Sequence, residues 1–169
     1  LSVVIPAYDE ADRIGHTLDE VHRQLAGVAK RGGVEVIVVD DGSTDDTTER
    51  AAAAGADRVV TLPENQGKGA AVRAGMQVAT GSTRVFLDAD LAYSPDQVLS
   101  LLKLTEAGWD VVVGSRKHSA TATLVQAGRL RQLGSMAINV LSSVVLLGRY
   151  RDTQCGLKAF RSEAAEAIF

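Results

Sequence analysis

Short runs of β-branched residues alternate along this chain with longer segments in which apolar residues recur every three or four positions. The short runs are nearly all apolar, which predicts strands that are buried on both faces of a sheet. The longer segments have the periodicity of amphipathic helices. The expected strands are residues 3–5, 34–39, 58–62, 84–87 and 110–114, with 157–160 as a further candidate. The expected helices are residues 14–28, 45–54, 69–79, 129–147 and 162–169, with one more that begins at Ser94.

This order of strands and helices predicts an α/β fold, with a mostly parallel β-sheet sandwiched by helices. A length of 169 residues suits one domain with its own core, so we expect a single domain over residues 1–169. The chain begins in a strand pattern and stops in a helical one, so we expect the C-terminal part of that domain to be missing. The sequence Ser94-Pro95-Asp96-Gln97 predicts a helix start, with Ser94 as the N-cap and Gln97 closing a capping box.

Composition and charge argue against several classes of protein. The net charge is −3 and the sequence has no basic tract, which disfavours nucleic acid as a partner. Cys155 is the only cysteine, so an internal disulfide is impossible, as is typical of a reducing compartment. The longest apolar stretch, residues 136–147, is shorter than the roughly 20 residues that a membrane-spanning helix needs. That stretch either packs in the core or rests one face on a membrane.

Polar and charged residues follow four of the expected strands. Ligands of open α/β sheets bind beyond the carboxyl ends of the strands, so these segments are where a site is expected. The four segments are Pro6-Ala7-Tyr8-Asp9-Glu10, Asp40-Asp41-Gly42-Ser43, Asp88-Ala89-Asp90 and Gly114-Ser115-Arg116.

Asp88 and Asp90 are the sharpest indication of chemistry. Two carboxylates one residue apart on a turn can converge on a hard divalent cation and leave positions open for phosphate oxygens. Asp-x-Asp also occurs as an ordinary turn or cap, and these residues alone leave both readings open. Their place directly after an expected strand favours the metal site.

Asp40 and Asp41 are adjacent carboxylates at a strand end, so their repulsion must be offset by a metal, backbone amides or the donors of a ligand. Nucleoside hydroxyls and base NH groups are suitable donors. The same loop can also cap the next helix through Ser43 or Thr44. Both roles are compatible, with Asp41 facing the ligand.

Lys68 lies in a glycine-containing loop, residues 65–69, that invites comparison with a phosphate-binding loop. The comparison with the Walker A pattern fails, because Leu62 stands where the first glycine belongs and Gly69 replaces the required serine or threonine. The first strand is also not followed by the dinucleotide-binding pattern of glycines. Lys68 nevertheless stays a candidate for contact with the ligand.

Four motifs, taken in order, resemble the family 2 glycosyltransferases of the GT-A fold, and the resemblance runs from Ser2 to Phe169. These motifs are Pro6-Ala7-Tyr8-Asp9-Glu10, Val39-Asp40-Asp41-Gly42-Ser43, Asn65-x-Gly67-x-Gly69 and Asp88-Ala89-Asp90. The second half, above all Asp152-Thr153-Gln154-Cys155-Gly156, is similar to the polyprenyl-phosphate sugar synthases. Within these it resembles the dolichyl-phosphate β-glucosyltransferases more than the dolichol-phosphate mannose synthases.

The resemblance implies a nucleotide-sugar donor, either UDP-glucose or GDP-mannose, and Mg²⁺ or Mn²⁺ as the cofactor. Asp90 would ligate the metal together with Asp88, phosphate oxygens and water. Where this chain has Ala92, the mannosyl enzymes usually carry a glutamine that ligates the metal. The implied donor contacts are Pro6, Tyr8, Glu10, Val39 and Asp41 for the nucleoside, and Asp88 and Ala89 for the nucleotide, with Lys68 as a further candidate.

The resemblance also implies an inverting hexosyltransferase whose acceptor is a polyprenyl or dolichyl phosphate, working at the cytosolic face of a membrane. Such a phosphate has a second pKa of about 6, so it needs holding more than it needs a general base. Arg116 and Arg131 would lie near the donor and acceptor phosphates, where the arginine fork pairs two oxygens at once. This accounts for the lack of a histidine-based catalytic pair, since His16 and His22 fall in an expected helix and only His118 lies in a candidate site loop.

Three other functions stay open. Transfer to a saccharide or protein hydroxyl would need a carboxylate base, which Asp152 would supply. A nucleotidyltransferase uses a similar sheet and metal, but its glycine-rich activating loop has no counterpart here. A nucleotide-sugar binding module without catalysis would leave Asp88 and Asp90 idle. The residues predicted to carry catalysis are therefore Arg116, Arg131 and Asp152.

Overall fold

The computed structural model describes residues 1–114 and 155–169. Leu1–Val113 and Gly156–Phe169 form one unit around a six-stranded sheet in the order β3-β2-β1-β4-β6-β5. β6 runs antiparallel to β4 and β5, and the other neighbouring strands are parallel. The strands are β1 (Ser2–Ala7), β2 (Glu35–Asp40), β3 (Arg58–Thr61), β4 (Thr83–Phe86), β5 (Val111–Val113) and β6 (Lys158–Arg161). The predicted α/β fold with a mostly parallel sheet is confirmed, including the further candidate strand as β6.

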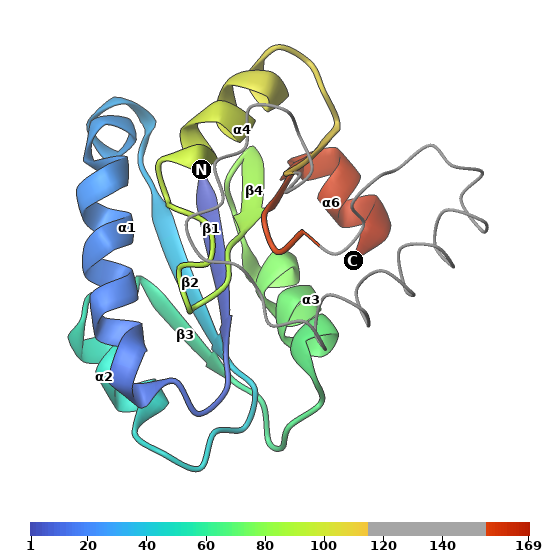
Figure 1. Cartoon of the computed structure of the whole chain (residues 1–169). Helices are drawn as coiled ribbons and strands as arrows, with labels where there is room; N and C mark the ends of the chain where they lie inside the picture. Colours follow the sequence, from blue (N-terminus) through green and yellow to red (C-terminus); the bar gives the residue numbers. More distant parts are fainter. Residues whose placement is uncertain (115–154) are drawn as a thin grey trace, which may run out of the picture. The chain divides into compact units, whose positions relative to one another are not determined.

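Helices cover both sides of this sheet. Figure 1 shows α1 and α2 on one side and α3 and α6 on the other. The helices are α1 (Ala11–Gly32), α2 (Thr47–Ala53), α3 (Lys68–Val78), α4 (Gln97–Glu106) and α6 (Ser162–Ile168). The apolar stripe predicted for the first helix is the buried face of α1, formed by Ile14, Leu18, Val21 and Leu25. The helix expected over 129–147 lies outside the described residues.

The predicted N-cap, Ser94, lies two residues before the observed one. α4 begins at Gln97, and its N-cap is Asp96, whose own side chain makes no capping hydrogen bond in the described structure. The amides of Gln97 and Val98 donate instead to the carbonyl oxygens of Ser94 and Pro95, at 3.0 and 3.1 Å. These backbone bonds form a tight turn ahead of the helix, so its first amides already have acceptors and the capping box does not form.

The strand register brings the predicted motifs to one edge of the sheet. β1 and β2 pair in parallel from Ser2 opposite Glu35 to Ala7 opposite Asp40. On its other side β1 pairs in parallel with β4, with Val4 opposite Phe86. The loops that follow β1, β2 and β4 therefore leave the sheet at the same end.

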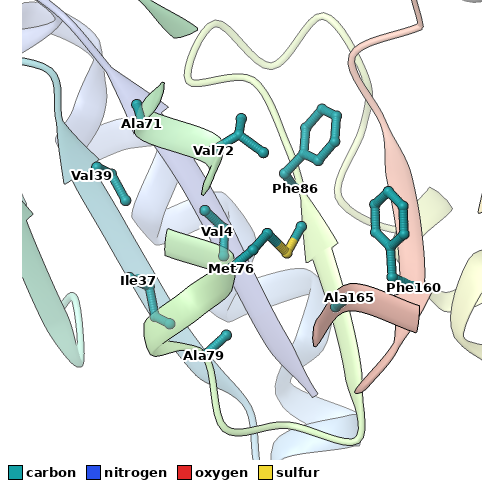
Figure 2. Packing of buried hydrophobic residues seen from close by; sticks show 10 residues of the cluster. All are labelled: Val4, Ile37, Val39, Ala71, Val72, Met76, Ala79, Phe86, Phe160 and Ala165. Atoms are coloured by element: carbon teal, nitrogen blue, oxygen red, sulfur yellow. The ribbon is translucent and has the colours of Figure 1, made fainter. Parts of the chain in front are cut away.

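The core on the α3 side of the sheet is a cluster of ten buried residues from four strands and two helices (Figure 2). Met76 of α3 is fully buried and lies among side chains from β1, β2 and α6. The cluster comprises Val4, Ile37, Val39, Ala71, Val72, Met76, Ala79, Phe86, Phe160 and Ala165. This packing fixes α3, whose first turn carries Lys68, against the strands that end at the candidate site.

Gly75 lets α3 approach the sheet closely, and its replacement tests that contact. A Cβ at Gly75 would overlap Cγ1 of Val4 and lie 2.9 Å from Cγ2 of Val39, both on buried strands. Gly75→Ala should therefore lower the free energy of unfolding by about 2 kcal/mol, although alanine favours helices. Gly69→Ala, the same change in the same helix with open space around it, should raise stability by about 0.5 kcal/mol. Urea unfolding of both variants measures this, and effects of the same sign would contradict the proposed packing.

Glu35 at the start of β2 links three segments and makes stability depend on acid pH. Partial burial acts to raise the pKa of its carboxyl, but hydrogen bonds from Ser2 and Thr80 outweigh burial and hold the pKa below its ordinary value of 4.5. The contribution of Glu35 to the free energy of unfolding is therefore present above pH 4.5, and it is lost as the pH falls through the lower folded-state pKa. Because the carboxylate is partly exposed, we expect less than about 1 kcal/mol. Glu35→Gln should be less stable than the parent in urea at neutral pH and equal to it at the acid end. A difference that stays constant with pH would contradict the assignment.

Candidate functional site

A pocket of about 450 Å³ lies at the edge where β1, β2 and β4 end. Eight residues predicted as donor or metal contacts line it: Pro6, Tyr8, Glu10, Asp41, Lys68, Asp88, Ala89 and Asp90. Ala7, Asn65, Gly67 and Ala71 complete the lining. The structure thus brings together side chains from four loops that are far apart in the sequence. Val39 pairs with Pro6 in the sheet but does not line the pocket, because its side chain is fully buried in the core cluster.

The loop after β1 is fastened to the loop after β2. The carboxylate of Asp9 accepts a hydrogen bond from the amide of Thr44 at 2.8 Å, and the amide of Asp9 donates to the hydroxyl of Ser43 at 2.9 Å. The amide of Glu10 donates to the hydroxyl of Thr47, also at 2.9 Å. Asp9 adopts a positive φ of 51°, which these bonds stabilise. The result is a fixed wall in which Tyr8 is exposed and Glu10 faces the pocket.

Asp45 strengthens the same fastening at the start of α1. Its carboxylate accepts hydrogen bonds from the hydroxyl and amide of Thr47 and from the amide of Ala11. These bonds, led by the one from the Thr47 hydroxyl, hold the pKa of Asp45 below its ordinary value. The carboxylate therefore stays ionised at neutral pH and anchors the first turn of the helix.

The adjacent carboxylates of Asp40 and Asp41 face different partners. Asp40 is buried and accepts hydrogen bonds from the amide and hydroxyl of Ser43 and from the hydroxyl of Thr48. Asp41 accepts one from the amide of Gln66 at 2.9 Å and lines the pocket. Protein donors therefore offset the repulsion that the sequence implies. The alternative role of this loop, capping by Ser43 or Thr44, is not what the structure shows, because α2 has Asp46 as its N-cap.

Asp88 and Asp90 lie on the turn that leaves β4. The amide of Leu87 still pairs with the carbonyl oxygen of Val4, at 3.0 Å, so the sheet holds the chain up to the turn. Oδ1 of Asp88 forms an ion pair with Nζ of Lys68 at 2.5 Å. Oδ1 of Asp90 accepts a hydrogen bond from the amide of Ala92 at 3.0 Å, and the residue is exposed. Both aspartates border the pocket.

Lys68 is also close to an aromatic ring. Its Nζ lies 6.0 Å from the ring centroid of Phe86, and Nζ of Lys158 on β6 lies 5.3 Å from the same centroid. Ammonium groups attracted to an aromatic face gain modest stabilisation. Phe86 thus helps to hold Lys68 next to Asp88.

The charge of the pocket bears on what it can bind. Among the described residues that line it, Glu10, Asp41, Asp88 and Asp90 are carboxylates and Lys68 is the ammonium. Such a lining repels a free diphosphate unless a cation accompanies it. No three histidine, cysteine, aspartate or glutamate side chains are grouped to hold a metal within residues 1–114 and 155–169. Two aspartates still fit Mg²⁺ or Mn²⁺, because Mg²⁺ is commonly held by one or two carboxylates with substrate phosphates and water completing its shell.

Several predicted residues cannot be placed. Arg116, Arg131 and Asp152, the predicted catalytic residues, lie outside the described residues, as do His118 and the apolar stretch 136–147. His16 is exposed on α1, and Nε2 of His22 forms a hydrogen bond with the carbonyl oxygen of Gly55 at 3.1 Å, away from the pocket. Within the described residues, the helices are too short or too polar to cross a membrane.

Two residues that contact the Asp88–Asp90 turn were not foreseen. The hydroxyl of Thr17 donates to the carbonyl oxygen of Ala89 at 2.6 Å, and Gly156 packs directly against the carboxylate of Asp88. Thr17 lies in an amphipathic helix pattern that indicates only a packing role. The sequence therefore does not predict its contact with the turn. Gly156 belongs to the segment Asp152-Thr153-Gln154-Cys155-Gly156. The family resemblance pointed to this segment but did not predict its contact with Asp88.

Comparison with known proteins decides the family. The model of the family described as "Glycosyl transferase family 2" matches residues 2–169. The chain belongs to glycosyltransferase family 2. The dolichyl-phosphate β-glucosyltransferase of Homo sapiens is 37% identical to it over 184 residues, covering 100% of this chain and 57% of that protein. The glycosyltransferase AglD of Haloferax volcanii is 35% identical over 173 residues, covering 99% of this chain and 27% of that protein. This family 2 chain spans about half the length of the dolichyl-phosphate β-glucosyltransferases it matches.

Solved structures confirm the predicted GT-A fold. The glucosyl-3-phosphoglycerate synthase of Mycobacterium tuberculosis, in complex with Mn²⁺, UDP and glucosyl-3-phosphoglycerate, matches with a TM-score of 0.70 and 29% identity. The match covers 96% of this chain and 56% of that one. The same synthase has also been solved with Mg²⁺ and UDP.

Proposed function

We propose that this chain is the catalytic domain, or a large part of it, of an inverting hexosyltransferase. It would move glucose from UDP-glucose to a polyprenyl or dolichyl phosphate. The observation that carries this proposal is the pocket that gathers Asp41 after β2, Lys68 at the start of α3, and Asp88 and Asp90 after β4. Membership of family 2 and the names of the similar proteins support the sugar and the acceptor.

The nucleoside would bind against the wall formed by Pro6, Tyr8 and Glu10. Tyr8 is 43% exposed at the pocket, so its ring can lie along a ligand without any change in the core. Asp41 offers carboxylate oxygens to the NH or OH donors of a nucleoside, and its hydrogen bond from Gln66 fixes its direction. Hydrogen bonding to a built polar group of this kind discriminates strongly between ligands with and without the matching donor.

Asp90 and Asp88 would hold Mg²⁺ or Mn²⁺ at the diphosphate. When bound, the metal ion would neutralise the charge that accumulates on the departing nucleoside diphosphate. Lys68 already lies at 2.5 Å from Asp88, so a small movement of its flexible chain would bring the ammonium to a phosphate oxygen. The carboxylates thus orient the donor, and the lysine adds positive charge on the same side.

The acceptor requires no general base from this chain if it is a phosphate. A phosphate monoester is largely ionised at neutral pH and supplies its own nucleophilic oxygen. Arg116 and Arg131 would hold that phosphate, and Asp152 would act as a base only for a hydroxyl acceptor. A lipid acceptor would bring the domain to a membrane surface, at its cytosolic side.

A second candidate acceptor is a small soluble phosphate ester. It is favoured by the structural match to a glucosyl-3-phosphoglycerate synthase, which has been solved in complex with phosphoglyceric acid. Donor chemistry would be the same in both cases. The two functions differ in the carrier and also in the nucleophile, because phosphoglyceric acid offers a hydroxyl besides its phosphate, and a hydroxyl would need a base such as Asp152.

Calorimetric titration followed by a transfer assay tests the proposal. UDP-glucose is expected to bind in the presence of Mn²⁺, to lose affinity when the metal is chelated, and to bind more tightly than GDP-mannose. Labelled glucose should then pass to dolichyl phosphate and be extracted with the lipid. Transfer to phosphoglyceric acid alone would establish the second candidate, and transfer to a saccharide alone would indicate a hydroxyl acceptor. An affinity for UDP-glucose that does not change when the chelator is added would contradict the metal mechanism.

A further inference from the structure

The Asp88–Asp90 turn is weakly held by its own backbone. Its internal hydrogen bond, from the amide of Leu91 to the carbonyl oxygen of Asp88, is long at 3.4 Å. Leu91 also has a positive φ of 53°, a conformation that side chains with a Cβ rarely adopt. Such a turn keeps its shape only where surrounding structure imposes it. The direction of the two carboxylates must therefore be set partly by residues outside the turn.

Thr17 supplies one of these outside contacts. It lies on α1, its side chain is 1% exposed, and its hydroxyl donates to the carbonyl oxygen of Ala89 at 2.6 Å. A helical threonine commonly turns its hydroxyl to a carbonyl of its own helix, one turn earlier. Here the hydroxyl instead reaches a residue 72 positions away. This carbonyl belongs to the peptide group that joins Ala89 to Asp90. Because the hydrogen bond fixes the orientation of that peptide plane, it also limits the direction in which the Asp90 side chain leaves the backbone.

Gly156 supplies the second contact, from the opposite end of the sequence. A Cβ at this position would overlap Oδ2 of Asp88 and lie 2.7 Å from its Cγ. The carboxylate of Asp88 therefore occupies the space that any other residue at 156 would fill. With Lys68 paired to Oδ1, the group is confined between a glycine and an ammonium.

We propose that Thr17 and Gly156 are positioning residues for the Asp-x-Asp turn: Thr17 directs Asp90 through the Ala89 carbonyl, and Gly156 leaves the space that directs Asp88. The expected effect of these residues on affinity for the metal–nucleotide complex rests on the proposed function. The contacts themselves involve only residues of this chain. The two statements can therefore be tested separately.

The first test uses two variants of Thr17 and the affinity of Mn²⁺ in the presence of UDP, measured by electron paramagnetic resonance. Thr17→Val keeps the shape but removes the hydroxyl, and should weaken Mn²⁺ binding about tenfold, the scale at which residues behind metal ligands act. Thr17→Ser keeps the hydroxyl and should stay within about twofold of the parent. Equal losses in both variants, or no loss in Thr17→Val, would overturn the role of the hydroxyl.

Thr105→Val is the matched control for a loss of stability. Thr105 is also a buried helical threonine, and its hydroxyl bonds the carbonyl oxygen of Leu102 and the hydroxyl of Thr83, away from the pocket. It should lower the melting temperature without changing Mn²⁺ affinity. If Thr105→Val weakened Mn²⁺ binding as much as Thr17→Val, the effect would be a general one and the positioning role would be wrong.

Gly156 is tested by Gly156→Ala, alone and combined with Asp88→Asn. The atoms that the new methyl group meets are the movable end of a side chain, so the variant should fold and shift the Asp88 carboxylate. Alone it should weaken Mn²⁺ binding about tenfold, and in the Asp88→Asn background it should add little, because both changes act through one group. Full additivity would overturn the assignment. Gly27→Ala, where a Cβ meets open space, is the control.

Amide chemical shifts of the unliganded protein separate this inference from the proposed function. Shifts of Ala89 to Ala92 should change in Thr17→Val and Gly156→Ala and be restored in Thr17→Ser. If they change but the parent chain does not bind Mn²⁺ with UDP, the proposed function is wrong and the positioning of the turn stands. If they do not change, the positioning is wrong whatever the chain binds.

Discussion

Asp90→Asn is expected to lower metal-dependent hexosyl transfer about thousandfold, equivalent to about 4 kcal/mol of transition-state stabilisation. Asp90 is exposed at the pocket, so the change removes a charge without disturbing the core. The asparagine oxygen can still accept the hydrogen bond from the Ala92 amide, which keeps the shape of the turn. What is lost is the negative charge that attracts the metal ion. The loss should appear both in turnover and in the affinity for UDP measured with Mn²⁺.

Asp96→Asn is the matched control for this prediction. Asp96 is another exposed aspartate, six positions further along the chain, and caps α4 without a side-chain hydrogen bond in the described structure. It should leave turnover and UDP affinity unchanged. Equal activity of the parent and Asp90→Asn would show that the carboxylate does not serve the reaction.

Gly42→Ala is expected to cause the largest loss of stability at the site, about 3 kcal/mol. Gly42 has a φ of 71°, and a Cβ there would lie 2.8 Å from the backbone nitrogen of Asn65 and 2.8 Å from Cα of Glu64. Positive φ costs an alanine roughly 1 kcal/mol, and overpacking against backbone adds about 1–3 kcal/mol because backbone cannot rotate away. The same clash would separate the loop that carries Asp41 from the loop that carries Lys68. Nucleotide affinity should therefore fall with stability.

Gly108→Ala isolates the conformational part of that effect. Gly108 ends α4 in the left-handed conformation with a φ of 102°, where the amide of Trp109 donates to the carbonyl oxygen of Leu104, and open space surrounds the position of its Cβ. This variant should lose only about 1 kcal/mol and keep nucleotide affinity. Chemical denaturation of the two variants gives the comparison. Equal losses would show that the approach of the two loops contributes nothing.

Much of the fold was predictable, because buried parallel strands appear in a sequence as short runs of apolar residues. The run at β2, five of whose six residues are buried, is one example. The polar segments after those strands could likewise be assigned to one edge, since parallel register carries strand ends to the same side. This is why Asp41, Asp88 and Asp90 could be placed at one pocket from the sequence.

Other features could not be predicted, because they depend on contacts between distant segments. The start of α4 depends on a backbone turn that satisfies its first amides, which the capping-box pattern does not reveal. Asp40 and Asp41 differ in their hydrogen-bond partners, and that difference depends on where Ser43, Thr48 and Gln66 lie. Thr17 is the extreme case, since its side chain is indistinguishable from ordinary packing until its partner 72 residues away is known.

Anomalous diffraction from crystals grown with Mn²⁺ and UDP tests whether Asp88 and Asp90 hold the metal ion at the diphosphate, because it locates the ion independently of turnover. We expect one strong manganese peak in the pocket, within ligand distance of the Asp90 carboxylate and of the UDP diphosphate, with the nucleoside against Tyr8 and Asp41. UDP bound in that pocket with the manganese elsewhere, or UDP bound away from Asp41, Asp88 and Asp90, would contradict it.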